Sequence, residues 1–238
     1  MLNKIALENI LFLDIETVPQ SAGFDAVPEE MKSLWERKAS HIKKENETTT
    51  DSYRHAGIYA EFGKIICIGA GYISGANEKR IIRIKAFAGD DERKLLSEFS
   101  EMIKKFFSGA NKYLCAHNGK EFDYPFIARR MLINGIALPP ALDTAGKKPW
   151  EVQHLDTMEL WKFGDYKSYT SLNLLATIFN VPTPKDDIDG SMVNEVYWKQ
   201  KDLERIVRYC RKDVLTVAQI ILRFKGEPLM ENGNIEMI

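Results

Sequence analysis

The sequence predicts an α/β protein in which a mixed five-stranded sheet is flanked by helices. Short apolar runs bounded by turn residues alternate along the chain with segments whose apolar residues recur at helical spacing. The predicted order is strand, polar insertion, two strands, helix, strand, helix, strand, and then further helices. This order is typical of a mixed sheet with helices against it, and the sequence contains no internal repeats.

The expected strands follow the apolar runs. The first covers ILFLDIETVP, residues 10–19, and the next two, 63–74 and 80–89, are joined by the turn-rich stretch SGANEK. A short strand within NKYLCAHNG, residues 111–119, ends in a turn. The last strand lies within VQHLDTMELW, residues 152–161, and runs directly into a helix.

Helices are expected where apolar residues recur at helical spacing behind a capping residue. Asp156 fits the N-cap position, with Glu159 three residues later. The expected helices are DDERKLLSEFSEMIKKFF (90–107), EFDYPFIARRMLING (121–135), SYTSLNLLATIF (168–179) and KDLERIVRYCRKDVLTVAQIILRF (201–224).

Residues 20–60 interrupt this pattern. We interpret them as an insertion, partly helical and partly mobile, in a single domain that covers residues 1–238. PEEMKSLWERKASHIKK, residues 28–44, has the pattern of a short amphipathic helix behind a proline, and ENETTTDS, residues 45–52, has almost nothing to bury. The insertion is either a solvated excursion or a lid that guides the substrate.

The composition is that of an ordinary globular protein. Lys and Arg number 33 and Asp and Glu 34, so the net charge of -1 does not indicate a nucleic-acid partner, and any attraction must come from local patches or bound metal. Cys67, Cys115 and Cys210 lie far apart without a CxxC pattern, so buried reduced thiols are expected. No signal peptide or membrane-spanning segment is recognisable, and we expect a soluble cytoplasmic protein with no membrane partner.

The first predicted strand ends with two acidic residues that require an explanation. Residues two apart in a strand point to the same side, so one face passes from Ile10 and Phe12 to Asp14 and Glu16. Two neighbouring carboxylates repel each other, and burial would raise the pKa of at least one of them. Either a positive charge holds both ionised or the pair lies in water.

Two further acidic positions occur where the pattern predicts the edge of the core. Asp123 follows a strand end on the first turn of a helix, at the rim where α/β proteins bind ligands, although Asp is also a routine cap there. On the helix 201–224, Tyr209 and Asp213 lie one turn apart at the margin of the apolar stripe. Taken alone, this Tyr and Asp could simply be hydrogen-bonded to each other.

These acids belong to three short patterns that follow one another along the chain: Asp14-x-Glu16-Thr17, Asn118-x-x-x-Phe122-Asp123 and Tyr209-x-x-x-Asp213. Together they resemble the motifs of the DEDD superfamily of 3′–5′ exonucleases, in the branch with Tyr in the third motif. AEFGKIICIGAGYI, GDYKSYTSLNLLATIFNVP and DIDGSMV look like segments of a stand-alone bacterial group related to the exonuclease domain of family-B DNA polymerases. The resemblance covers about residues 8–225, is poorest over 20–60, and implies a ribonuclease-H-like fold.

The resemblance implies a two-metal-ion exonuclease that uses Mg²⁺ or Mn²⁺. Hard cations prefer carboxylate oxygens, and two of them can activate water, relieve phosphoryl charge and stabilise the leaving 3′ oxygen. By this resemblance Asp14 bridges both cations, and Glu16 and Asp213 bind the one that carries the attacking water. Asp123 holds the second cation, directly or through water. Tyr209 orients the attacking water and stays protonated, since a free phenol titrates near about pH 10.

The implied substrate is nucleic acid with a free 3′ end, shortened to release nucleoside 5′-monophosphates. Single strands are expected because an unpaired 3′ end enters a binding site more easily than a base-paired one. DNA is favoured, and an exoribonuclease that trims RNA is an alternative, because the phosphate chemistry is indifferent to the sugar. A polymerase acting in trans would be a functional partner in proofreading.

Four residues are candidates for contacts to the substrate. Thr17 and Asn118 are expected to touch the terminal nucleotide, and Phe122 packs either against its base or into the core. Lys167 is a candidate for a phosphate contact, against the alternative of an ordinary charged surface.

Two rival functions fit parts of the pattern. A catalytically silent nucleic-acid-binding module on the same scaffold would usually have lost a metal ligand, but all four acids and the tyrosine are present. A haloacid-dehalogenase-like phosphatase also begins with acids at a strand end, as Asp-x-Asp-x-Thr, but this chain has Glu16 at the second place. The complete set of ligands favours the exonuclease.

Overall fold

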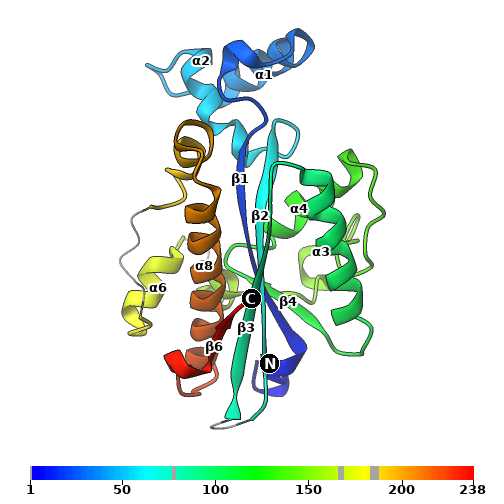
Figure 1. Ribbon diagram of the computed structural model, residues 1–238, viewed down its shortest axis with the longest axis vertical. Coiled ribbons are helices and arrows are strands. Elements are labelled where there is room, and N and C mark those ends of the chain that lie inside the picture. Colours follow the sequence, from blue (N-terminus) through cyan, green and yellow to red (C-terminus); the bar gives the residue numbers. More distant parts are fainter. Residues whose placement is uncertain (1, 77–78, 166–168, 183–187) are drawn as a thin grey trace.

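The computed structural model describes residues 2–76, 79–165, 169–182 and 188–238. Within these ranges the chain forms a six-stranded mixed sheet of order β5-β4-β1-β2-β3-β6 (Figure 1). The strands are β1 (Ile10–Pro19), β2 (Gly63–Ser74), β3 (Ile81–Ala88), β4 (Tyr113–Ala116), β5 (Leu155–Asp156) and β6 (Ile235–Met237). β1, β2 and β3 form an antiparallel meander, whereas β4 runs parallel to β1, β5 parallel to β4, and β6 parallel to β3.

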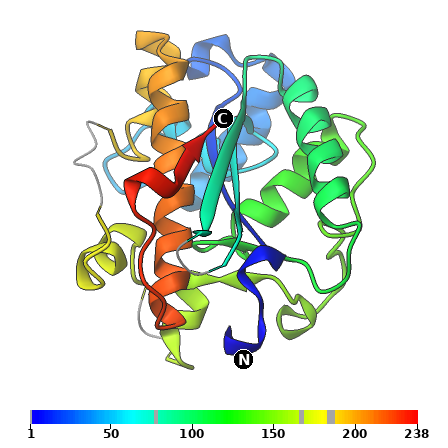
Figure 2. The same ribbon diagram turned by 60° about the horizontal axis from the view of Figure 1, so that its bottom comes forward.

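The mixed α/β class and all five predicted strands are confirmed, but the predicted number of strands was one too low. The additional strand, β6, pairs with the outer edge of β3, and the Ile238 N–H extends the pairing by donating to the Ile84 carbonyl at 2.8 Å (Figure 2). Only three residues long, β6 carries too little alternation to be recognised from its own sequence.

Helices cover both faces of the sheet. In Figure 1, α3 and α4 lie on one side of the strands and α6 and α8 on the other. The helices of the described residues are α1 (Glu29–Ile42), α2 (Thr49–Ser52), α3 (Glu92–Phe106), α4 (Asp123–Ile133), α5 (Thr157–Lys162), α6 (Leu172–Ile178), α7 (Val193–Glu195) and α8 (Leu203–Phe224). A π-helical turn, Val196–Gln200, joins α7 to the segment before α8.

The side chains of β1 alternate between these two layers as predicted. Leu11, Leu13 and Ile15 pack in one core cluster with residues of α3 and α4. Ile10 and Phe12 face the other way, into a cluster with the apolar stripe of α8. Asp14 and Glu16 lie on the same face of β1 as Ile10 and Phe12, so their side chains are on the side of the sheet that α8 covers.

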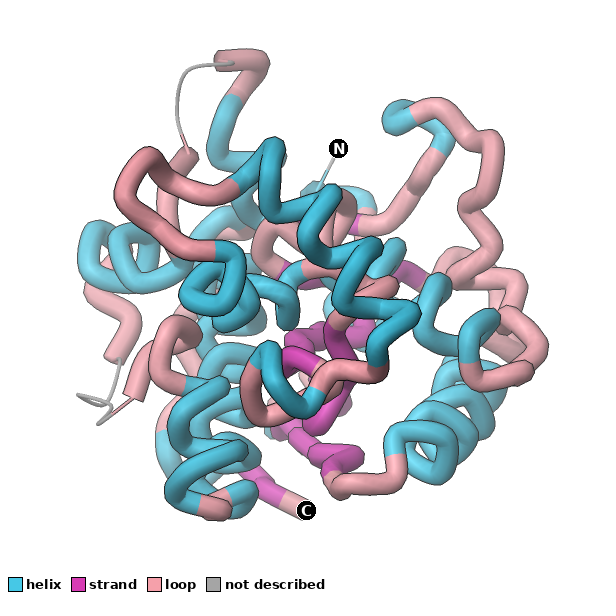
Figure 3. The backbone as a smooth tube through the Cα atoms, turned by 90° about the horizontal axis from the view of Figure 1, so that it is seen from above, coloured by secondary structure: helices cyan, strands magenta, loops and turns pink. Residues whose placement is uncertain are grey.

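The insertion between β1 and β2 folds around its own small core. Trp35 of α1 is fully buried among Val27, Ala39, Tyr53 and Ala56, with its ring edge-on to Tyr53 at 5.5 Å. Where the insertion leaves the sheet, the Gln20 N–H donates to the Phe62 carbonyl at 3.0 Å. Its helices lie over the end of the sheet when the molecule is viewed from above (Figure 3). The predicted helix behind Pro28 is therefore present, and the partial mobility of the insertion stays a prediction.

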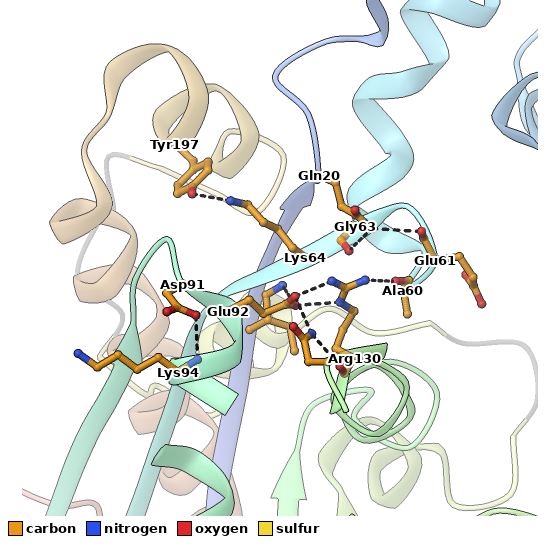
Figure 4. Close-up of polar contacts among 12 residues, drawn as sticks. Gln20, Ala60, Glu61, Gly63, Lys64, Asp91, Glu92, Lys94, Arg130 and Tyr197 are labelled. Carbon is orange, nitrogen blue, oxygen red and sulfur yellow. Dashed lines mark hydrogen bonds and ion pairs between the residues drawn. The ribbon is translucent and has the colours of Figure 1, made fainter. Parts of the chain in front are cut away.

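A buried ion pair ties α3 and α4 to β2 and to the end of the insertion (Figure 4). The Arg130 guanidinium donates to both carboxylate oxygens of Glu92, at 2.8 and 2.5 Å, and to the Ala60 carbonyl at 2.8 Å. Glu92 also accepts the Ile65 backbone N–H at 2.7 Å. Because a buried charge is tolerated only when it is paired and hydrogen-bonded, this network fixes α4 against the sheet.

No helix within the described ranges is long and apolar enough to cross a lipid bilayer.

Candidate active site

Asp14 and Glu16 lie where β1 passes under α8. In the pairing of β1 with β2, Asp14 stands opposite Gly69 and Glu16 opposite Cys67, and the register shifts between Glu16 and Thr17. Such irregularities are frequent next to active sites, because they change the direction of the side chains that follow. Glu16 is only 7% exposed, so the acidic end of the strand is held inside the protein.

Gly69 allows α8 to come close to this part of the sheet. A Cβ atom at Gly69 would lie 2.8 Å from Val214 Cγ2 and 3.0 Å from Cys210 Sγ. The first of these two distances is shorter than the contacts that real Cβ atoms make. Cys210 is fully buried here, and its thiol lies 3.5 Å from the Asp14 carbonyl, to which it donates. The missing side chain therefore lets α8 lie directly against β1 and β2.

Tyr209 and Asp213 project from this part of α8. They flank Cys210 on the helix, and the Tyr209 hydroxyl donates a hydrogen bond to the Asp213 carboxylate. Burial raises the pKa of Tyr209 far above its ordinary value, and the charge of Asp213 and then those of Glu16 and Asp14 raise it further. The phenol is therefore held protonated, and both α8 residues lie close to the acids of β1.

Asp123 reaches the same place from α4. β1 pairs with β4 only as far as Phe12, which stands opposite Cys115, so the β4 side of β1 is open beyond that point. The start of α4 occupies this gap, and the Ile15 backbone N–H hydrogen-bonds to the Asp123 carboxylate. Asp123 is 4% exposed, and burial raises the pKa of its carboxyl to about 8.

The four acids predicted from three separate motifs thus lie together. Burial raises the pKa of Asp14 well above its ordinary value, and three neighbouring charges raise it further, in the order Glu16, Asp213, Asp123. The pKa of Glu16 is raised in the same way, by burial first and by Asp213 next. Each carboxylate therefore makes ionisation of the others harder, which is the repulsion that the strand pattern implies.

The donor set fits hard divalent cations. Asp14 Oδ2 is buried and accepts no hydrogen bond, which is costly for a carboxylate oxygen unless a cation approaches it. One carboxylate oxygen each of Asp14 and Glu16 and the Cys210 sulfur lie within 4.8 Å of one another. Carboxylates are the ligands that Mg²⁺ and Mn²⁺ prefer, and a thiol is not, so the acids are the candidate metal ligands and Cys210 is a packed neighbour.

The residues predicted to contact the substrate have different surroundings. Thr17 is half-buried beside Glu16 on β1. Asn118 has a positive φ of 61°, and its buried Oδ1 accepts no hydrogen bond. Phe122 packs against the core, 5.4 Å from the Phe126 ring, so the packing alternative is present and a contact with a base stays a prediction. Lys167 lies outside the described residues.

Sequence reasoning gave Asp156 only the role of a helix cap, and the structure adds a second one. Its carboxylate caps α5 through the Met158 N–H at 2.9 Å, as predicted. It also accepts the backbone N–H groups of Asn118 at 2.9 Å and Lys120 at 3.1 Å, and so holds the loop that precedes Asp123. Nothing in the local pattern indicates this contact, because the two segments are 36 to 38 residues apart.

A cavity of about 580 Å³ opens next to this loop. It lies between the start of α4 and the segments on either side of β5 and α5. Residues that line it include Asn118, Lys120, Tyr124, Lys147, Met158 and Lys162. The acids of β1 and α8 are not among its lining residues, so the cavity does not contain the acidic cluster. The two are neighbours at Asp156, which lines the cavity and whose charge raises the pKa of Asp123.

Comparisons with known proteins concern the fold and the family of this chain. The solved structure of the family B DNA polymerase from the hyperthermophilic archaeon Pyrobaculum calidifontis superimposes with a TM-score of 0.50 and 16% identity, over 90% of this chain and 24% of the polymerase. It shows a shared fold, in agreement with the expected ribonuclease-H-like sheet. A DNA polymerase from Pyrococcus glycovorans is 23% identical over 164 residues, which are 58% of this chain and 21% of the polymerase. The chain thus spans about a quarter or less of the length of these relatives.

A family model, described as a predicted 3′–5′ exonuclease related to the exonuclease domain of PolB, matches residues 58–231. The matched segment contains Asp123, Tyr209 and Asp213, whereas β1 with Asp14 and Glu16 lies before it. Because the model matches well over half of the sequence, the chain belongs to this family of 3′–5′ exonucleases related to the exonuclease domain of PolB.

Proposed function

We propose that the protein is a metal-dependent 3′–5′ exonuclease that shortens single-stranded nucleic acid, preferably DNA, and releases nucleoside 5′-monophosphates. One observation carries the proposal: carboxylates from β1, α4 and α8 meet in a buried cluster in which Asp14 Oδ2 has no hydrogen-bond partner. Such a cluster is unfavourable for a protein unless cations neutralise it. Membership of the PolB-related exonuclease family supports the reaction class.

Asp14, Glu16, Asp123 and Asp213 are the residues that would hold two divalent cations. When bound, such a pair supplies an activated water, neutralises phosphoryl oxygens and stabilises the leaving 3′ oxygen. The protein contributes a rigid and largely dry cage: Glu16 and Asp123 are buried, and the Ile15 N–H orients the Asp123 carboxylate. Preorganised charges of this kind need little rearrangement when the substrate arrives.

We assign Tyr209 the role of orienting the attacking water. Its hydroxyl donates to Asp213, and its raised pKa keeps the proton on the oxygen at neutral pH. A protonated phenol cannot remove a proton from water, but its oxygen can still accept a hydrogen bond and so fix the water's direction. The role is therefore one of positioning, in agreement with a tyrosine-type third motif.

The proposed 3′-to-5′ direction of shortening and the preference for DNA rest on the family relationship. The similar proteins described above are DNA polymerases, and the matching family is described as a predicted 3′–5′ exonuclease. Asn118 lines the cavity and has a buried Oδ1 with no hydrogen-bond partner, which supports a contact between this residue and the terminal nucleotide. If the biological role is proofreading, a polymerase acting in trans would supply the mismatched ends.

The test compares the wild type with Asp14→Ala on a 5′-labelled single-stranded DNA oligonucleotide in the presence of Mg²⁺ or Mn²⁺. We expect the wild type to produce a ladder that shortens from the 3′ end and the variant to produce none. Glu98→Ala removes an exposed carboxylate from α3, on the opposite face of the sheet, and serves as the matched control that should keep wild-type activity. Removal of metal with EDTA should stop the wild type, and Mn²⁺ titration calorimetry should show binding that Asp14→Ala loses.

Other outcomes would replace the proposal. Equal binding of the oligonucleotide by both proteins without shortening in either would identify a catalytically silent binding module. Faster shortening of a matched RNA oligonucleotide would move the substrate preference to RNA. Shortening from the 5′ end, or activity that survives both Asp14→Ala and EDTA, would show that the acidic cluster is not the catalytic centre.

A further inference from the structure

The carboxylate of Asp156 accepts hydrogen bonds from two separate segments of the chain. Its Oδ1 accepts the N–H groups of Met158 at 2.9 Å and Glu159 at 3.3 Å in the first turn of α5, and also the Asn118 N–H at 2.9 Å. Its Oδ2 accepts the Lys120 N–H at 3.1 Å. Because the residue is only 2% exposed and both oxygens accept protein hydrogen bonds, Asp156 is not itself a candidate metal ligand.

Capping of α5 does not account for a buried aspartate at this position. Asn or Ser caps a helix as well as Asp does, and neither brings the cost of burying a charge. A carboxylate differs from these caps because both of its oxygens accept hydrogen bonds and neither donates one. The Oδ2 of Asp156 accepts its hydrogen bond from Lys120, in the loop between β4 and α4, so this loop accounts for a carboxylate here.

The same loop fixes the start of α4. Phe122 occupies the N-cap position of α4, and its side chain cannot accept a hydrogen bond. The first N–H groups therefore donate to the loop, from Phe122 to the Asn118 carbonyl at 3.0 Å and from Tyr124 to the Gly119 carbonyl at 2.9 Å. Asp123 lies between these two anchored residues, so its position follows that of the loop.

Neighbouring contacts also tie the β4–α4 segment to β5 and α5. The Thr157 hydroxyl is hydrogen-bonded to His117 Nδ1 at 2.9 Å and lies 3.4 Å from the Ala116 carbonyl. The Tyr124 hydroxyl donates to the Leu155 carbonyl at 2.8 Å. The junction of β5 and α5 therefore holds both the loop and the first turn of α4.

We propose that Asp156 is a positioning residue of the exonuclease reaction, which sets the place of Asp123 in the acidic cluster through the loop between β4 and α4. The contacts run from the Asp156 carboxylate to the backbone of Asn118 and Lys120, and from the carbonyls of this loop to the first turn of α4. In this role Asp156 contacts neither the cations nor the substrate. The inference rests on the proposed function and adds to it a residue outside the four acids and Tyr209.

The test separates positioning from folding with three variants. Asp156→Asn keeps one oxygen for the cap of α5 and replaces the other with an NH₂ group, which cannot accept the Lys120 N–H. Thr157→Val is milder, since it keeps the side-chain shape and removes a hydroxyl that contacts the same segment. Asp91→Ala is the control, because it removes the carboxylate that caps α3 through the Lys94 N–H at 3.0 Å, on a helix with no predicted site residue.

Initial rates are measured on a 5′-labelled oligo(dT) strand at varied strand and Mn²⁺ concentrations, and Mn²⁺ affinity is measured by calorimetry. Per folded molecule, Asp156→Asn should lower kcat by about 10- to 100-fold and weaken Mn²⁺ binding, as the loss of groups that orient metal ligands does. KM for the strand should change less, because the retained oxygen still accepts the Asn118 N–H. Thr157→Val should lower kcat by about 3- to 10-fold. Asp91→Ala should keep the wild-type kcat although its unfolding midpoint falls.

The inference is overturned if Asp156→Asn, like Asp91→Ala, keeps wild-type kcat and Mn²⁺ affinity per folded molecule. A rise in KM alone would also overturn it, because Asp156 would then act on strand binding and not on Asp123. If Asp156→Asn does not fold, Thr157→Val decides, and wild-type kcat with wild-type Mn²⁺ affinity in that variant would count against the inference.

Failure of the proposed function would look different. A wild type that binds Mn²⁺ and shortens no strand would remove the exonuclease, and calorimetry on Asp156→Asn would still decide whether this residue sets the place of Asp123. A wild type that binds no Mn²⁺ at all would overturn both.

Discussion

At the scale of single residues, Asp123 shows the cost of the acidic cluster most directly. Its pKa is raised to about 8, chiefly by burial, from an ordinary value of 3.8. The folded protein without metal therefore holds a proton at Asp123 that the unfolded chain releases near pH 4. Between these two pKa values the unfolded state binds fewer protons than the folded state, so this residue makes stability fall as the pH rises from about 4 to about 8.

Asp123→Asn should remove this pH dependence. In EDTA, the variant and the wild type should have similar unfolding midpoints near pH 4, where the Asp123 carboxyl is neutral in the folded wild type and only partly ionised in the unfolded chain. At pH 9 the variant should be the more stable, because its amide stays uncharged. Thermal melts between pH 4 and 9 check this, and a wild-type midpoint that follows the variant's midpoint across this range would contradict it. Adding Mn²⁺ should stabilise the wild type more at pH 9 than at pH 5, since metal binding displaces protons.

Tyr209 is predicted to act on the rate and not on metal binding. Tyr209→Phe removes the hydroxyl that donates to Asp213 and keeps the ring, so the metal affinity measured by calorimetry should stay within a few-fold of wild type. The rate of shortening should fall by about 100-fold, which is the lower end of the rate enhancement that a positioned general acid or base contributes. Because the phenol is protonated throughout, the pH–rate profile between pH 6 and 9 should keep its shape. A variant that lost metal binding and rate in parallel would show that Tyr209 supports the cage instead.

At the scale of secondary-structure elements, the contact of α8 with the sheet decides whether the acids meet. Asp14 stands opposite Gly69, and the space that a side chain would take at Gly69 is occupied by Val214 and Cys210 of α8. The acids of β1 and the two polar residues of α8 are therefore neighbours because one strand position carries no side chain. The buried Glu92–Arg130 pair does the corresponding work for α4, which it fixes to β2.

Gly69→Ala should separate α8 from β1. The added methyl group overfills the contact and should cost about 1–3 kcal/mol of stability. Because a misplacement of about 1 Å can lower a rate by 100-fold, the rate of shortening should fall by more than the loss of folded protein explains. Gly23→Ala is the matched control, since a Cβ there meets no atom within 4 Å. Denaturation curves and rates at saturating Mn²⁺ check both parts, and wild-type activity in Gly69→Ala would show that the approach of α8 is not needed.

At the scale of the whole molecule, the insertion has a small hydrophobic core of its own, separate from the main core of the sheet. Trp35 is the fully buried centre of its cluster, as Phe99 of α3 is fully buried in the main core. The two clusters share none of their residues, although the insertion contacts β1 through the segment Tyr53–Ile58. Regions with separate small cores can open without unfolding the rest of a protein.

Trp35→Ala should therefore open the insertion alone. The substitution should cost its local core about 3–5 kcal/mol. Amide hydrogen exchange should then speed up across residues 21–58 while the amides of β1 and β2 keep their protection. Phe99→Ala, the control in the main core, should speed exchange throughout the sheet. Loss of protection in the β1–β2 pairing of Trp35→Ala would show that the insertion and the sheet fold as one unit.

The sequence by itself determined five of the six strands, the main helices and the order of the acids, because all of these depend on short-range patterns. The alternation in β1 placed Asp14 and Glu16 on one face, helical spacing placed Tyr209 and Asp213 one turn apart, and the pattern around Asp123 put it at a helix start. These features follow from the periods of strand and helix, which a chain carries locally. The catalytic roles of these residues remain predictions for the experiments above.

Only the tertiary structure decided what these elements meet. The approach of α8 at Gly69, the pairing of β6 with β3, and the hold of Asp156 on the loop before Asp123 all join residues far apart in sequence. Such contacts depend on the shape and packing of both partners, and neither partner's local pattern contains that information. The acids could therefore be identified from the sequence, whereas their proximity to one another depends on the folded structure.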